Sequence, residues 1–80
     1  MKTETLRKKV EKNYNALFEN EYERPVHNRF NVNGTECAII KWGNSISVMF
    51  NRDIADSFDF TFEEGVQPVF ECICNRVINA

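Results

Sequence analysis

The sequence predicts one small α+β domain, mostly of β-strand, that begins with a long helix. Three observations predict this class: an apolar stripe of helical period over residues 3–22, alternating apolar patterns after it, and the turn signal Asn33-Gly34. The chain has 80 residues, which is room for one domain. Its core should be thin, because a domain of this size buries only about 60% of its unfolded surface.

Residues 1–24 are predicted to form an amphipathic helix from Thr3 to about Tyr22. Its apolar side chains recur at the spacing of one helix face, and they are Leu6, Val10, Tyr14, Leu17 and Phe18. The helix should end at Arg24-Pro25, because the residue before a proline avoids helical angles. We expect this stripe to pack either on the rest of the domain or on a second chain.

Residues 25–80 are predicted to form a β domain. Asn33-Gly34 favours the two positive-φ positions of a type I′ turn, and it should close a hairpin with arms 29–32 and 35–41. Gly43-Asn44-Ser45 is a second turn signal. The elements expected after it are a strand over 46–50, a short helix over 52–58, a strand over 66–73 and a last short strand over 76–78. Trp42 and the phenylalanines are expected in the core.

Charge and hydropathy narrow the class of protein. The net charge is −2, with a positive surplus in residues 1–30 and a negative one in residues 31–80. The basic cluster Arg7-Lys8-Lys9 with Lys12 could attract phosphate, or could be the solvated side of the helix. No apolar run approaches the roughly 20 residues of a membrane span, and the N-terminus lacks the apolar block of a signal peptide. We expect a cytoplasmic protein that does not enter a membrane.

The chemistry-bearing residues are few. The chain has 3 Cys and 1 His, an odd cysteine count that favours reduced thiols. Cys72 and Cys74, on one face of a predicted strand, could bind zinc with Cys37 or His27, but small apolar core residues are the favoured interpretation. His27 has no paired nucleophile, and 3 Gly leave no phosphate-binding loop. We expect neither an enzyme nor a metal or other cofactor.

A longer motif lies in the middle of the chain. Residues 39–50 read Ile-Ile-Lys-Trp-Gly-Asn-Ser-Ile-Ser-Val-Met-Phe, and Asp53-Ile54-Ala55 and Glu64-Gly65 follow. Over about residues 38–78 this order resembles the AbrB/MazE family of swapped-hairpin DNA-binding domains. The resemblance implies a homodimer in which two chains exchange hairpins to build one β-barrel.

The resemblance implies a dimeric transcriptional regulator, or an antitoxin of a toxin–antitoxin system, that binds operator DNA and, as an antitoxin, a toxin. The family's DNA-binding end corresponds here to Lys41, Asn44, Ser45 and Arg52. Lysine and arginine attract phosphate, while asparagine and serine bond to phosphates or base edges. A protein partner would bind the helical stripe Leu6, Val10, Tyr14 and Leu17.

Two alternatives stay open. The first is a protein-interaction or inhibitor module on the same fold that has lost DNA binding, as in an accessory or phage-type factor. Met49, where the family usually has arginine, Asn51, where it usually has proline, and the acidic residues 31–80 favour this alternative. The second is a coincidental match, in which case the chain is a monomeric α+β domain.

Overall fold

The strands form one antiparallel meander with two helices beside it. The computed structural model describes residues 2–19 and 25–78. Their elements are α1 (Thr3–Ala16), β1 (Val26–Val32), β2 (Thr35–Trp42), β3 (Ser45–Phe50), β4 (Asp53–Thr61), a 3-10 helix (Phe62–Glu64) and α2 (Val66–Val77). The sheet order is β1-β2-β3-β4. The predicted α+β class, mostly of strand, is confirmed.

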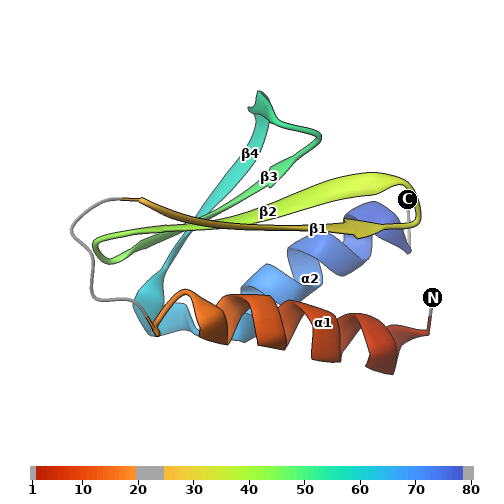
Figure 1. Ribbon diagram of the computed structural model, residues 1–80, viewed down its shortest axis with the longest axis horizontal. Coiled ribbons are helices and arrows are strands. Elements are labelled where there is room, and N and C mark those ends of the chain that lie inside the picture. The colour runs from red at the N-terminus through yellow and green to blue at the C-terminus, as the bar shows by residue number, and fades with distance from the viewer. Residues whose placement is uncertain (1, 20–24, 79–80) are drawn as a thin grey trace.

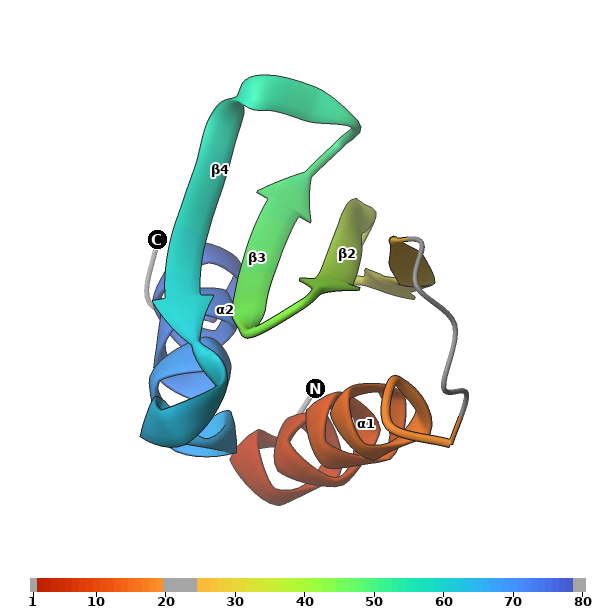
Figure 2. The ribbon, with the colours of Figure 1, turned by 90° about the vertical axis from the view of Figure 1, so that its left-hand side faces the viewer.

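Both helices lie on the same side of the sheet (Figures 1 and 2). α1 contacts β1 and α2, and α2 also contacts β3. The buried core fills the space between the helices and the sheet, so α1 and the β domain share one core. The opposite face of the sheet carries no helix of the described chain. In that part of the chain no helix is long and apolar enough to cross a membrane.

The apolar stripe of α1 packs inside its own chain. Leu6, Val10 and Leu17 are 0% exposed, and Tyr14 is 6% exposed. Burying side chains of this size stabilises the fold by roughly 2 kcal/mol each. Of the two packing partners that the sequence left open, the structure shows the rest of the domain.

α1 ends earlier than predicted. The N–H groups of Leu17, Phe18 and Glu19 bond to carbonyls three residues before them, which tightens the last turn. These bonds close the helix after Ala16. The remaining part of the predicted helix, residues 20–22, lies outside the described residues.

The Asn33-Gly34 hairpin is confirmed. Both turn residues have positive φ, 50° and 87°, and Val32 pairs with Thr35 across the turn. The arms are longer than predicted, because β1 begins at Val26 and β2 ends at Trp42. The predicted second turn and the strand after it also form, and β3 adds only Ser45 to the predicted strand.

The predicted helix over 52–58 is wrong, because residue 52 lies in a turn and residues 53–58 belong to β4. Asn51 and Arg52 have positive φ values of 53° and 58°, which make a two-residue turn that reverses β3 directly into β4. The alternation of polar and apolar residues over Ser57-Phe58-Asp59-Phe60 then matches the two-residue period of a strand.

The predicted strands over 66–73 and 76–78 are wrong as well, since α2 covers residues 66–77. Its β-branched residues suggested a strand, but Val69, Phe70 and Ile73 share the buried helix face. Pro68 is tolerated because it lies in the first turn, where N–H groups have no partner within the helix. Cys72 and Cys74 therefore point in different directions, since two helical residues span about 200°.

Candidate binding surface

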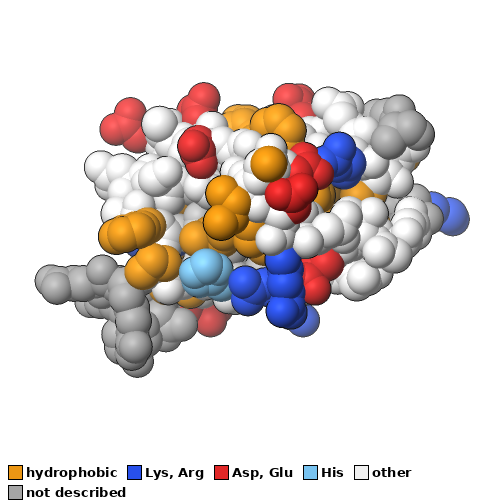
Figure 3. Space-filling view, turned by 90° about the horizontal axis from the view of Figure 1, so that it is seen from above, with side chains coloured by type: hydrophobic (Ala, Val, Ile, Leu, Met, Phe, Trp, Pro, Cys, Tyr) orange, Lys and Arg blue, Asp and Glu red, His pale blue; other side chains and the backbone are white. Residues whose placement is uncertain are grey.

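The side of the sheet that faces away from the two helices exposes apolar, polar and charged side chains together. We call it the outer face. Strand alternation places on it the residues between the core positions. They are His27, Arg29, Asn31, Glu36, Ala38, Ile40, Trp42, Ser45, Ser47, Met49, Ser57, Asp59 and Thr61. Hydrophobic side chains gather near the middle of this face (Figure 3).

Trp42 is the most prominent apolar side chain of the outer face. The sequence predicted it in the core, but it is 67% exposed. It ends β2 on the side that no helix of the described chain covers, and this position explains the difference. Ile40 and Met49, on the same face, are partly buried. A large aromatic residue beside aliphatic neighbours is typical of the centre of a protein interface.

Shallow hollows lie on both sides of Trp42. One is lined by Trp42 and residues of β3, β4 and their flanks, among them Ser45, Asp59 and Thr61. The other is lined by Trp42, Ile40, Gly43, Ser45 and Ser47. The outer face therefore presents a projecting ring between two depressions, a relief that a partner's side chains can match.

Charge divides the outer face along the direction across the strands. On this face β1 carries the exposed His27 and Arg29, while β4 carries the exposed Asp59. Between them, Glu36 of β2 lies beside Arg29, with Arg29 Nε 3.5 Å from Glu36 Oε1. Figure 3 shows several acidic side chains toward one margin and the histidine with basic side chains toward the other, although acidic and basic side chains also lie next to each other near both margins. Asp59 also accepts a hydrogen bond from the Ser47 hydroxyl at 2.7 Å, which fixes its carboxylate.

The structure does not bring the four predicted DNA-binding residues together. Lys41, Asn44 and Ser45 lie at the β2–β3 turn, and Arg52 lies at the β3–β4 turn. β3 has 6 residues and separates these turns by about 20 Å. Lys41 also points to the helix side of the sheet, where its ammonium lies 5.8 Å from the centre of the Phe18 ring.

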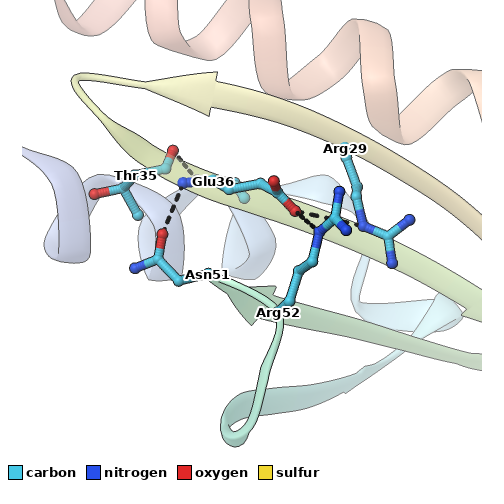
Figure 4. Close-up of polar contacts among 6 residues, drawn as sticks. Arg29, Thr35, Glu36, Asn51 and Arg52 are labelled. Atoms are coloured by element: carbon cyan, nitrogen blue, oxygen red, sulfur yellow. Dashed lines mark hydrogen bonds and ion pairs between the residues drawn. The ribbon is translucent and has the colours of Figure 1, made fainter.

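Arg52 is already engaged with a carboxylate (Figure 4). Its Nε donates a hydrogen bond to Glu36 Oε1 at 2.8 Å, and Arg29 Nε lies 3.5 Å from the same oxygen. This hydrogen bond raises the pKa of Arg52. A guanidinium paired in this way attracts a phosphate less strongly than a free one.

The predicted partner-binding stripe, Leu6, Val10, Tyr14 and Leu17, offers no surface. These side chains form part of the core described above, because α1 turns them toward the sheet and α2. Asn28 Nδ2 donates to the Asn13 carbonyl at 2.8 Å, and Arg7 donates to Gln67 at 2.9 Å. These bonds hold α1 against both β1 and α2, so the stripe stays covered in this fold.

Two of the four residues of the basic cluster of α1 make contacts within the domain, and the other two are exposed. Arg7 lies 4.2 Å from the centre of the Phe70 ring, and Lys9 donates to the Asn31 carbonyl at 2.7 Å. Lys8 and Lys12 are exposed on the helix. The cluster is therefore partly used within the domain and partly solvated.

The cysteines are free thiols. Cys37 is buried, while Cys72 and Cys74 are partly buried. Burial, with a smaller contribution from nearby Cys72, raises the pKa of Cys37 to about 11. Burial also raises the pKa of Cys72. The described part of the chain contains no group of three or more His, Cys, Asp or Glu residues placed to hold a metal ion.

No protein-family model matches the sequence, and no curated protein or solved structure matches it significantly. A site on the outer face is therefore supported by the residues of this chain alone.

The outer face was not predicted as a site from the sequence, although one signal was available. β2 is apolar on both faces, with Cys37 and Ile39 on one and Ala38, Ile40 and Trp42 on the other. A strand of that kind at a sheet's open face indicates a surface for a partner.

Proposed function

We propose that this chain is a protein-interaction module whose binding surface is the outer face of the sheet. One observation carries the proposal, namely that Trp42 is 67% exposed beside Ile40 and Met49 on a sheet face that no described helix covers. Exposed apolar clusters rimmed by polar residues mark protein-interaction sites on soluble proteins. Aromatic side chains in such positions commonly contribute most of the binding energy.

The electrostatics favour a protein partner over DNA. A DNA-binding surface is usually a continuous basic patch. Here Asp59 and Glu64 line the hollow beside Trp42, and the sequence has a net charge of −2. These carboxylates would repel phosphates next to Asn44 and Ser45. Operator binding by a swapped-hairpin dimer stays a prediction, which a salt titration of binding to duplex DNA would test.

The proposal can be tested with a photo-cross-linking amino acid at position 40, in place of Ile40, in the full chain. The matched control carries the same amino acid at position 8, because Lys8 is exposed on α1, in the helical layer beneath the sheet. A polypeptide cross-linked in cells from position 40 but not from position 8 is expected. The same polypeptide, once purified, should bind the chain, and Trp42→Ser should weaken that binding at least tenfold.

Cross-linking in cells to nucleic acid alone, or equal cross-linking from positions 40 and 8, would contradict the proposal. Binding of the purified partner that Trp42→Ser leaves unchanged would also contradict it. The variant should keep its fold, because the Trp42 ring contributes little to the core. A far-UV circular dichroism spectrum matching that of the parent chain verifies this.

A further inference from the structure

We infer that the partner of the outer face is a second copy of this chain, packed sheet on sheet. The two copies are related by a two-fold axis that lies between the sheets and runs parallel to their strands. This inference rests on the proposed function, since it names the occupant of the same surface. Two features carry it: the division of charge across the outer face, and the sizes of the side chains on β2 and β3.

The charge division selects this axis. Two sheets that pack face to face keep their strand directions within about 30° of each other. A two-fold axis parallel to the strands then places β1 over β4 of the other copy, and β2 over its β3. An axis across the strands would place each strand over its own copy. Only the first arrangement brings the side of His27 and Arg29 over the side of Asp59.

The strand register makes the pairing specific. His27, Ile40, Ser47 and Asp59 form one row across the sheet. The two-fold axis reverses this row in the other copy, so His27 lies over the partner's Asp59. Each dimer contains this contact twice. Both side chains are exposed in the single chain, and the hydrogen bond from Ser47 occupies only Oδ1 of Asp59, which leaves its other carboxylate oxygen for the contact.

Side-chain size is complementary in three rows of residues across β2 and β3, one of which is the row just described. β2 presents Ala38, Ile40 and Trp42, and the residues paired with them on β3 are Met49, Ser47 and Ser45. Each row therefore holds one large apolar and one small residue. Because the axis places β2 over β3, every large residue faces a small one of the other copy, as close packing requires.

Trp42 is the clearest case of this fit. It would lie over the partner's Ser45, at the hollow that Ser45, Asp59 and Thr61 help to line. The ring would lose its exposure, and its indole N–H would come within reach of the carboxylates that line this hollow, those of the partner's Asp59 and the partner's Glu64. A buried tryptophan generally needs such a hydrogen-bond acceptor.

The inference predicts that the purified full chain is a dimer. Light scattering after size exclusion should give twice the chain mass, and dilution should shift the mass toward 9.4 kDa. Trp42 is the only tryptophan, so its fluorescence should move to longer wavelength in the same concentration range. A chain that stays monomeric at all concentrations overturns the inference.

A charge-reversal pair tests the arrangement. His27→Asp places a carboxylate over the partner's Asp59, and Asp59→Lys places an ammonium over the partner's His27. Each variant alone should dimerise about tenfold more weakly than the parent chain. In His27→Asp two carboxylates face each other at both contacts, and in Asp59→Lys the carboxylate that faces His27 is lost at both contacts. An equimolar mixture should recover a dimer that contains one copy of each, since one contact then joins opposite charges. Lys12→Glu, an exposed charge reversal on α1, should leave dimerisation unchanged.

The outcomes separate this inference from the proposed function. A monomeric chain that still cross-links another polypeptide from position 40 overturns the inference and leaves the proposed function standing. A dimer that the charge-reversal variants do not weaken, or that their mixture does not restore, overturns the two-fold arrangement. A monomeric chain without any cross-link specific to position 40 overturns both.

Discussion

Arg52, in the β3–β4 turn, is paired with Glu36 of the neighbouring strand β2, with Arg52 Nε 2.8 Å from Glu36 Oε1. The same turn places Asn51 beside the Glu36 backbone, with Asn51 Oδ1 accepting its N–H at 3.0 Å and Asn51 N–H donating to its carbonyl at 2.8 Å. These contacts tie the turn to β2. They also explain why a segment that could begin a helix instead reverses into a strand (Figure 4).

Asn51→Ala should destabilise the fold by roughly 1–2 kcal/mol. The substitution removes the acceptor for the Glu36 N–H and places a residue with a Cβ but no polar side chain at a φ of 53°. Urea unfolding followed by circular dichroism measures the change. Asn51→Asp, which keeps an acceptor and tolerates this φ, should lose much less stability. Equal losses in the two variants would contradict the role of the side chain.

Arg52→Gly should leave the fold more stable than Arg52→Ala does. Both remove the ion pair with Glu36, but only glycine relieves the positive φ of 58° at this position. The glycine variant should therefore unfold at a higher urea concentration than the alanine variant. The reverse order would show that residues 51 and 52 do not form the two-residue turn.

Leu6→Ala should destabilise the domain by about 2–5 kcal/mol, because Leu6 is 0% exposed in the core between α1, α2 and the sheet. That loss is a large part of the stability of so small a domain. Thermal unfolding of Leu6→Ala and of Lys8→Ala, an exposed neighbour on α1, provides the comparison. If α1 bound only a partner, the isolated chain would tolerate both substitutions equally.

Gly65→Ala should destabilise the fold by roughly 1–3 kcal/mol. Gly65 joins the 3-10 helix to α2 with φ 78° and ψ −167°, a region that only glycine adopts readily. A Cβ at this position would meet no atom within 4 Å, so the loss comes from the backbone and not from a clash. Urea unfolding checks the value, with Glu63→Ala, an exposed change in the 3-10 helix that precedes Gly65, as control.

Stability should fall as the pH rises from about 9 to about 11. Burial raises the pKa of Cys37 from 9.0 to about 11, so the folded state holds the thiol proton more tightly than the unfolded state. This stabilisation is complete below the ordinary pKa and is lost as the pH passes the folded one. Urea unfolding across this range should show a steeper decline for the parent chain than for Cys37→Ala. Parallel declines would contradict the assignment to Cys37.

The sequence by itself determined the elements whose signals are local. The stripe of α1 required one buried helix face, and Asn33-Gly34 required a tight hairpin because few residues accept two positive φ values in succession. The same signals indicated β3 and the α+β class. They act between residues close in the chain, so no knowledge of the tertiary structure is needed to interpret them.

Only the tertiary structure decided β4, α2 and the outer face. Residues 53–61 become a strand because β3 supplies hydrogen-bonding partners along one edge, and residues 66–77 become a helix because the core accepts Val69, Phe70 and Ile73 on one side. Trp42 is exposed because both helices cover the opposite face, and Arg52 lies far from Ser45 because β3 runs between them. Each of these outcomes depends on contacts between segments distant in sequence, which override local propensity.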